Sequence, residues 1–294
     1  MALTICSTGV SLKALSYLIN QETPLSIKQL EVSAPEYSPA KTQFVTIHSS
    51  YLDARHDISL YNAYSTKPDI PVILFLHGVY GNHWVWMNLG GIHQVYDALQ
   101  NQGLEEFLLV MPSDGGLKDG SAYLPLGQTG DYEKWIIDDV IQAVKQVKVP
   151  YVTDKSRWYI SGLSMGGYGA LRLGVKYPEQ FSAISAHSSI TRIEDMAQFV
   201  NTPLSFYDCA NANETNILYW AGKNAAALPP IRFDCGTDDP LLASNQWLNR
   251  QFLAFGIDHM YQEYPGAHQW SYWHEHVAKS FTWFSNIEKS HKKR

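Results

Sequence analysis

The sequence predicts an α/β fold, in which a doubly wound, mostly parallel sheet carries helices on both faces. Two observations indicate this class. Short apolar segments alternate along the chain with helical patterns, as strand–helix repeats do. These segments are short and mainly apolar, and residues 71–76 and 107–111 are apolar at every position, which is typical of strands covered on both sides. A chain of 294 residues is long enough for one large domain of this kind.

The first elements follow an N-terminal region without a regular pattern. Residues 1–42 are expected to form an irregular extension packed on the domain, and residues 43–294 to form the domain itself. At its start, residues 44–48 and 57–61 are predicted strands, and the second shows alternating polarity. The sequence contains no internal repeat and no clear interdomain linker, which favours a single domain.

The central strands are predicted where apolar runs stop at a glycine, a proline or a histidine. They are residues 71–76, 107–111, 157–161, 181–186 and 231–235, and residues 261–264 are expected to form the last strand. Apolar residues at helical spacing predict helices at 133–147, 165–177, 241–255 and roughly 270–287. Ligands bind beyond the carboxyl ends of strands in such sheets, so a site is expected where these strands stop.

Residues 191–228 depart from this alternation. They contain Pro203, Gly222 and several asparagines between short apolar patches. We expect an excursion over the face that carries the site. It is either a small lid or a structural surface loop without a chemical role.

Composition bears on partners and compartment. The formal net charge is −6 and the one cationic cluster is the last four residues, so neither nucleic acid nor an anionic membrane is an expected partner. The three cysteines have neither disulfide-framework nor metal-ligand spacing, and the first residues lack the charged region of a signal peptide. No apolar stretch is long enough to span a membrane. We therefore expect a cytoplasmic protein.

A serine motif follows one of the predicted strands. Residues 162–167 (GLSMGG) lie between a strand and a helix, the context that a G-x-S-x-G nucleophile motif requires. Glycines two positions before and after Ser164 leave room for a tight turn with a strained backbone. Such a turn exposes the hydroxyl above the sheet, at a helix N-terminus that favours negative charge. Ser164 is therefore the candidate nucleophile.

A base and an acid are expected later in the chain, because a serine hydroxyl needs a neighbouring base to take its proton. In hydrolases with this motif the order is serine, acid, histidine. His268 follows the last predicted strand and is the candidate base. Asp238 and Asp239 both follow strand 231–235 and compete as the acid. Asp239 is also placed to cap the helix that Pro240 opens, and Asp238 could be an exposed turn residue.

Two backbone N–H groups are expected to stabilise a developing oxyanion. One belongs to Met165, directly after the candidate nucleophile, and the other to Val79, after strand 71–76. The candidate substrate-contacting residues are His77, Gly78, Tyr80, His187 and Trp270. A bracing role for His77 and a core position for Trp270 are the alternatives.

Neither a metal ion nor a cofactor is expected. His274 and His276 lie two positions apart on a predicted helix, so they point to different faces. The sequence also lacks the H-E-x-x-H pattern of zinc hydrolases.

Four segments together resemble the "Putative esterase" family of α/β-hydrolases. They are residues 76–82 (LHGVYGN), 162–170 (GLSMGGYGA), 235–242 (CGTDDPLL) and 266–270 (GAHQW), and the resemblance extends from about residue 44 to residue 287. The family includes esterase D (S-formylglutathione hydrolase), tributyrin-type bacterial esterases, feruloyl and acetylxylan esterases, and mycolyltransferases. The chain is most similar to the tributyrin-type bacterial esterases.

The resemblance implies the α/β-hydrolase fold and assigns the site. In the family the acid lies two residues before a large apolar residue, which favours Asp239 over Asp238. The histidine in a G-x-H-x-W context is His268, and the second oxyanion N–H falls on Val79. The implied function is that of a serine carboxylesterase, which hydrolyses short-acyl, small-molecule esters through an acyl-enzyme intermediate.

Other functions stay open. Esterase D carries a cysteine-bearing loop that residues 79–82 lack, which disfavours S-formylglutathione hydrolysis. Feruloyl and acetylxylan esterases are generally exported, which disfavours them here. A catalytically silent relative that serves as a binding module would usually have lost one triad member, and all three candidates are present. The oligomeric state is left open, a homo-oligomer included.

Overall fold

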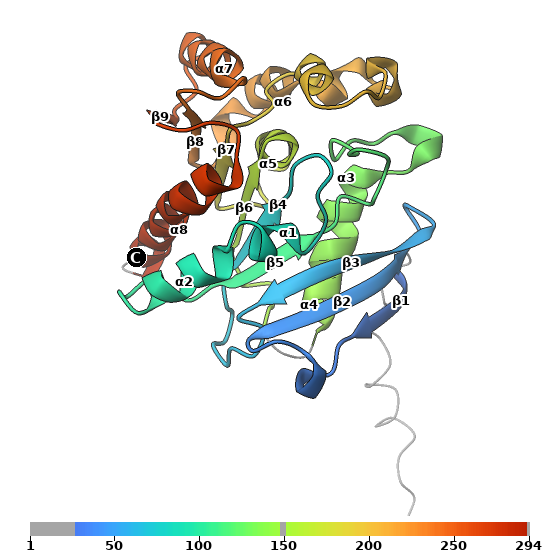
Figure 1. Ribbon diagram of the computed structural model, residues 1–294, viewed down its shortest axis with the longest axis vertical. Helices are drawn as coiled ribbons and strands as arrows, with labels where there is room; N and C mark the ends of the chain where they lie inside the picture. The colour runs from blue at the N-terminus through green and yellow to red at the C-terminus, as the bar shows by residue number, and fades with distance from the viewer. Residues whose placement is uncertain (1–26, 148–150, 293–294) are drawn as a thin grey trace, which may run out of the picture.

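The computed structural model describes residues 27–147 and 151–292, which form one mixed sheet flanked by helices (Figure 1). The order of the strands in the sheet is β1-β2-β3-β5-β4-β6-β7-β8-β9. The strands are β1 (Ile27–Val32), β2 (Thr42–Ser49), β3 (Ala54–Tyr61), β4 (Val72–Leu76), β5 (Leu108–Pro112), β6 (Trp158–Leu163), β7 (Ala183–His187), β8 (Ile231–Gly236) and β9 (Met260–Tyr264).

The sheet has an antiparallel part and a larger parallel part. β1, β2 and β3 pair in antiparallel fashion, and β3 pairs in the same way with β5. From β5 through β4, β6, β7 and β8 to β9, every neighbouring pair is parallel. The loops that follow β4, β6, β8 and β9 therefore lie along one edge of the sheet, where ligands bind in this class of fold.

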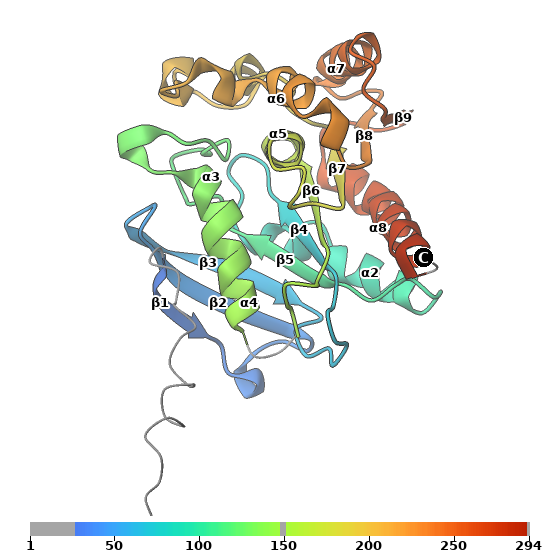
Figure 2. The same ribbon diagram turned by 180° about the vertical axis from the view of Figure 1, so that it is seen from behind.

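Helices cover both faces of the sheet, as the sequence predicts. α1, α2 and α8 lie on the face turned to the viewer in Figure 1, and α3, α4 and α5 lie on the opposite face, seen in Figure 2. The helices are α1 (Val85–Asn88), α2 (Ile92–Gln100), α3 (Tyr132–Lys134), α4 (Ile141–Gln146), α5 (Met165–Lys176), α6 (Ile217–Lys223), α7 (Leu242–Ala254) and α8 (Trp270–Lys292).

β4 illustrates why a central strand can be apolar at every position. Val72, Leu74 and Leu76 belong to the core beneath α4 and α5, whereas Ile73 and Phe75 belong to the core beneath α2 and α8. Neighbouring side chains of a strand point to opposite faces, so a strand covered on both sides buries apolar residues at successive positions. Its carboxyl end leads directly into the loop with Val79.

The sheet begins earlier than the sequence predicts. Residues 27–32 fall in the extension 1–42 that was expected to be irregular, yet they form β1 and pair with β2. β1 is an edge strand whose exposed positions include Lys28, Gln29 and Glu31, so it lacks the apolar pattern that marks the central strands. Residues 1–26 of the expected extension lie outside the described residues.

The helix expected at 133–147 is interrupted. A π-helical segment, Trp135–Val140, separates α3 from α4. The fully buried Trp135 lies in this wider turn, and its indole N–H donates to the carbonyl of Ser113 at 2.8 Å. Helices α1, α2 and α6 were not predicted, and α8 continues to Lys292, beyond the expected end at 287.

Residues 191–228 pack on the domain as a series of short turns and α6. They include the 3₁₀ segments Ile193–Gln198, Leu204–Tyr207, Ala212–Thr215 and Ala225–Ala227. The Tyr168 hydroxyl on α5 donates to the carbonyl of Thr215 at 2.8 Å, and the Tyr207 hydroxyl donates to the carbonyl of Gly120 at 3.2 Å. These bonds hold the excursion against the edge of the sheet where the candidate site lies.

Candidate active site

Ser164 lies on the turn between β6 and α5, and its backbone is strained. Its φ of 54° and ψ of −122° are sparsely populated for a residue with a side chain. The turn is fixed from both sides, because the Ser164 N–H donates to the carbonyl of His187 at 3.0 Å and its carbonyl accepts from Ile190 at 3.2 Å. The serine thus precedes the first turn of α5, as the motif predicts.

The glycines of the motif are required by close backbone contacts. A Cβ added at Gly162 would lie 2.1 Å from the carbonyl oxygen of Gly166, and one added at Gly166 would lie 2.1 Å from the carbonyl oxygen of Leu76. Both distances are far below van der Waals contact. A residue with a side chain at either position would therefore force the turn apart.

Three candidate side chains from distant parts of the sequence meet at this turn. Nε2 of His268 lies 2.9 Å from Oγ of Ser164. On the other side of the ring, Nδ1 lies 2.9 Å and 3.1 Å from the two carboxylate oxygens of Asp239. The geometry allows a proton to pass from the hydroxyl to the imidazole while the carboxylate holds the ring tautomer.

The two aspartates that compete in the sequence differ in position. Asp239 is buried and contacts His268, whereas Asp238 is exposed to solvent. Asp239 also accepts a hydrogen bond from the N–H of Leu241 at 2.8 Å, so it braces the turn before α7. The sequence predicts that Pro240 opens this helix, whereas α7 begins at Leu242.

The two candidate oxyanion donors flank the same serine. Met165 is the first residue of α5, and its N–H has no partner among the described residues. The N–H of Val79 likewise makes no hydrogen bond within the described chain. A Cβ added at Gly78 would lie 3.2 Å from Cβ of Ser164, so the loop with Val79 passes directly beside the serine.

His77 was predicted to contact the substrate, but its side chain is turned into the protein and braces this loop. The side chain is buried. Its Nε2 accepts from the N–H of Asp114 at 3.0 Å, and its Nδ1 donates to the carbonyl of Gly78 at 2.7 Å. Both ring nitrogens are occupied, which is the bracing alternative that the sequence left open.

His187 is also misplaced by the sequence prediction. It ends β7 beside Ser164, but its side chain is fully buried within the sheet and does not line the cavity. Its Nδ1 lies 3.0 Å from the carboxylate of Asp234, and its Nε2 lies 2.8 Å from the hydroxyl of Ser280. His187 contributes to the turn at Ser164 through its backbone, because its carbonyl accepts a hydrogen bond from the Ser164 N–H.

Asp234 is the centre of this buried polar cluster. It also accepts from Arg232 at 2.6 Å and from the Tyr272 hydroxyl at 2.9 Å. Burial alone would raise the pKa of the Asp234 carboxyl, but His187, Arg232 and Tyr272 outweigh it and hold that pKa far below its usual range. The cluster joins β7 and β8 to α8, directly behind the loop that carries His268.

A small apolar cavity of about 230 Å³ opens beside Ser164. Gly78, Tyr80 and Trp270, three of the predicted substrate-contacting residues, line it. Trp84 and Trp86, which lie a few residues after Tyr80 in the sequence, do not. The full lining is Gly78, Val79, Tyr80, Gly81, Val85, Leu163, Ser164, Phe199, His268, Trp270 and Trp273.

Phe199 is a lining residue that the sequence did not reveal. It lies in the excursion 191–228, with its ring centroid 4.8 Å from that of His268. The Tyr80 hydroxyl donates to its carbonyl at 2.6 Å and so ties the excursion to the loop after β4. No local motif surrounds Phe199. The predicted excursion of residues 191–228 over the site was the one indication that a residue of this segment could line the cavity.

The described residues contain no group of three or more His, Cys, Asp and Glu side chains that could hold a metal ion. Within the same part of the chain, no helix is long and apolar enough to cross a membrane. His274 and His276 are separated as expected. His274 bonds the carbonyl of Gly90, whereas the ring of His276 stacks on that of Tyr264.

Comparison with known proteins identifies the family. A sequence model of the family described as "Putative esterase" matches residues 49–284. The chain belongs to this family. The esterase is 29% identical over 236 residues to a protein named acetyl esterase from Caldicellulosiruptor saccharolyticus, a match that covers 74% of this chain and 85% of that one.

Solved structures agree with the fold of this esterase. A fluorophosphonate-binding serine hydrolase from Staphylococcus aureus superposes with a TM-score of 0.72 at 18% identity, over 84% of this chain and 99% of the other. An S-formylglutathione hydrolase from Agrobacterium tumefaciens superposes with a TM-score of 0.67 at 16% identity, over 90% and 99%. The fold is that of the α/β-hydrolases. With the family match, these similarities make the protein a serine esterase, a carboxylic ester hydrolase.

Proposed function

We propose that this esterase hydrolyses short-acyl esters through a covalent acyl-enzyme formed on Ser164. The serine oxygen attacks the ester carbonyl while His268 Nε2 takes its proton. The tetrahedral adduct then collapses, the bond to the alcohol oxygen breaks, and His268 returns the proton to the departing alcohol. Water then attacks the carbonyl of the acyl-enzyme while His268 takes its proton. The second adduct collapses, which releases the carboxylic acid and restores the serine.

Asp239 and two backbone amides complete the proposed mechanism. The buried carboxylate accepts from Nδ1 of His268 and stabilises the imidazolium that forms at each step. The N–H groups of Val79 and Met165 donate to the carbonyl oxygen when it becomes negative, and the N-terminus of α5 adds its dipole. The 2.9 Å contact between Ser164 and His268 is the observation that carries this assignment.

The preference for short acyl groups is supported by the size and lining of the cavity. Its volume of about 230 Å³ is smaller than the pockets of roughly 300–1,000 Å³ that enclose drug-sized ligands. Its walls are mostly aliphatic and aromatic, which suits a small alkyl group better than a charged one. The relative named acetyl esterase points in the same direction.

S-formylglutathione and feruloyl or acetylxylan esters are the second candidates, because structures of an S-formylglutathione hydrolase and a ferulic acid esterase share the fold. The small cavity disfavours a feruloyl group, whose aromatic ring needs more room. A cytoplasmic location belongs to the same proposal. Within the described chain Cys209 and Cys235 are both unpaired, which is usual in a reducing compartment.

The test is Ser164→Ala, measured by kcat/KM on p-nitrophenyl acetate, with S-formylglutathione and methyl ferulate as comparison substrates. We expect a loss of about 10³-fold or more, because the variant lacks the attacking atom. Labelling by a fluorophosphonate probe should disappear with it. Ser161→Ala is the matched control, since Ser161 is fully buried on β6 and its hydroxyl has no hydrogen-bond partner in the described chain.

Ser161→Ala should retain labelling and activity. If Ser164→Ala kept more than about a thousandth of the wild-type rate while folded, the nucleophile would be a different residue. A wild-type protein that neither reacted with the probe nor cleaved any of the three esters would instead be a silent binding module. A preference for methyl ferulate over the acetate would overturn the short-acyl assignment, and a preference for S-formylglutathione would identify the substrate as a thioester and not an oxygen ester.

A further inference from the structure

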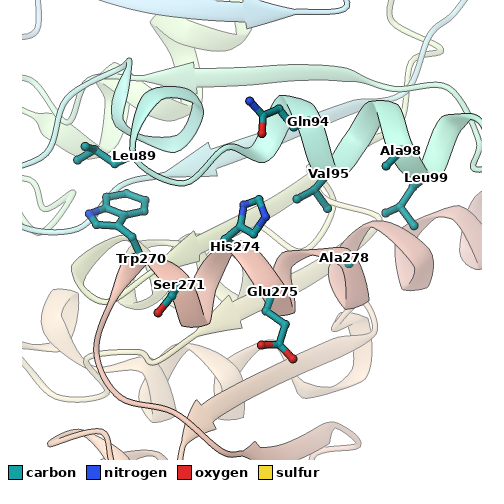
Figure 3. A pocket seen from close by; sticks show the side chains of 10 residues that line it. All are labelled: Leu89, Gln94, Val95, Ala98, Leu99, Trp270, Ser271, His274, Glu275 and Ala278. Carbon is teal, nitrogen blue, oxygen red and sulfur yellow. The ribbon is translucent and has the colours of Figure 1, made fainter.

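A second and larger hollow lies next to the cavity at Ser164. It is a groove of about 710 Å³ between α2 and α8, shown from close by in Figure 3. Its apolar lining residues are Leu89, which directly follows α1, Val95, Ala98 and Leu99 of α2, and Trp270 and Ala278 of α8. The polar residues Gln94, Ser271, His274 and Glu275 complete the lining.

Trp270 is the residue that the two linings share. In Figure 3 its indole lies at one end of the groove, next to Leu89, with Leu99 and Ala278 toward the other end. On its other side it belongs to the wall of the cavity that contains Ser164 and His268. One side chain therefore lies between the small cavity and the long groove.

Close packing holds the indole of Trp270 in this position. Its ring centroid is 5.1 Å from that of Trp273 and 6.2 Å from that of Trp86, with both pairs edge to face. A Cβ added at Gly90 would lie 3.1 Å from the ring, so the indole also rests on the Gly90 backbone. His274 hydrogen-bonds to the Gly90 carbonyl at 2.8 Å and fixes that backbone to α8.

We propose that Trp270 is a specificity-determining wall, which confines the alkyl part of the ester to the small cavity and excludes it from the groove between α2 and α8. This rests on the proposed function of Ser164. The cavity alone is smaller than ordinary ligand pockets, whereas the groove falls within their range. Removing the indole joins the two spaces and lets an unbranched alkyl chain lie along apolar side chains.

The experiment compares wild type with Trp270→Ala and Trp270→Phe on two series of esters. The first lengthens the acyl group, from p-nitrophenyl acetate to the octanoate. The second lengthens the alcohol, from ethyl acetate to octyl acetate. In at least one series, Trp270→Ala should raise the ratio of kcat/KM for the eight-carbon ester to that for the two-carbon ester by about tenfold or more. Trp270→Phe should give a smaller rise.

The two series distinguish which half of the ester faces Trp270, and either result supports the wall. Trp84→Ala is the matched control. It removes an indole that is 40% exposed on the same face but lines neither space, so its ratios should equal those of wild type. Unchanged ratios in both series for a folded Trp270→Ala would overturn the role of Trp270.

A crystal structure of Trp270→Ala tests the wall without using activity. It should show one continuous space from Ser164 to Val95. If Leu89 or Trp86 instead filled the vacated volume, Trp270 would not be what separates the two spaces. If the wild-type protein did not hydrolyse p-nitrophenyl acetate, the proposed function would be refuted. If the wild type hydrolysed it and Trp270→Ala left the ratios of kcat/KM unchanged, only the role of Trp270 would be refuted.

Discussion

Aromatic rings flank the imidazole of His268 on two sides. The ring of Phe199 is tilted against it, at 4.8 Å and 31°, and the ring of Trp273 meets it edge to face, at 5.0 Å and 89°. With both sides occupied, the imidazole has little room to rotate. Nε2 therefore stays directed at Ser164 and Nδ1 at Asp239, which lowers the entropic cost of reaching the reactive geometry.

The adjacent pair Asp238 and Asp239 allows a matched test of the acid. Asp239→Asn should lower kcat/KM for a short-acyl ester by about 10³–10⁴-fold, because an amide does not stabilise the imidazolium and favours the wrong tautomer. Asp238→Asn removes an exposed charge of the same type one position away and should change the rate less than about twofold. Steady-state kinetics with far-ultraviolet circular dichroism would measure both. Equal losses would show that the local charge matters and the contact with His268 does not.

The sequence predicts the site residues that lie in motifs. It does not predict residues whose place in the site depends on the direction of the side chain. Ser164 and His268 follow from strand ends and local sequence, and the geometry brings them together as expected. His187 was wrong because a position at a strand end does not say which way the side chain points, and here it points into the sheet. Phe199 was missed because its neighbours in space are distant in sequence.

At the scale of elements, the junction between β6 and α5 depends on the absence of side chains. β6 enters the turn at Gly162, α5 leaves it past Gly166, and the backbones touch each other and the end of β4. This close approach places the N-terminus of α5 against the loop with Val79. The strand, the helix and the loop therefore act as one unit that presents Ser164.

Two glycine substitutions should have opposite effects on stability. Gly162→Ala places a Cβ 2.1 Å from the Gly166 carbonyl oxygen, and it should lower the free energy of unfolding by about 3 kcal/mol and kcat/KM by about 10²-fold. Gly222→Ala, on α6, meets no atom within 4 Å and should raise the free energy of unfolding by about 0.5–1 kcal/mol. Urea unfolding and ester kinetics measure both. A tolerated Gly162→Ala would contradict the tight junction.

Apolar pattern predicted the buried elements far better than the exposed or irregular ones. Central strands such as β4 and β6 are mainly apolar, and their positions agree with the structure to within about two residues. β1 was missed because an edge strand is stabilised by its ladder to β2 and not by an apolar face. The π-helical segment Trp135–Val140 was missed because one extra residue per turn hardly alters the apolar spacing.

For the molecule as a whole, buried charges fasten α8 to the sheet. Near its start, Tyr272 donates to the carboxylate of Asp234, on β8. Near its end, Glu288 accepts from Arg157 at 2.7 Å and from the Tyr159 hydroxyl at 2.6 Å. Since α8 directly follows the loop of His268, these two anchors also set the position of the proposed base.

These anchors predict a loss of stability in acid. Burial alone would raise the pKa values of Asp234 and Glu288, but their donors and cationic neighbours hold both below the usual range. A carboxyl whose pKa is lowered on folding stabilises the fold above its unfolded pKa, near 4, and this contribution fades as the pH falls. The free energy of unfolding should therefore decrease from pH 5 to pH 3, as measured by urea titration.

Asp234→Asn isolates one of these anchors. At pH 5 it should lower the free energy of unfolding by about 3–5 kcal/mol, because the buried Arg232 loses its partner. The difference in the free energy of unfolding between the variant and wild type should decrease below about pH 4, where the Asp234 carboxylate begins to lose its stabilising contribution in wild type. Asp238→Asn, at an exposed position, is the control and should follow wild type. A gap that stayed constant down to pH 3 would show that the ionised carboxylate is not what stabilises α8.

The backbone of Ser164 has a consequence for how this enzyme can be improved. A residue with a side chain at φ 54° and ψ −122° costs about 1–3 kcal/mol, and glycine would adopt the same torsions more easily. A strained backbone position is thus also the one that has to react. A substitution that relaxed this turn would raise thermal stability but lower the catalytic rate. Stabilising substitutions should therefore be made at sites far from the turn, such as Gly222.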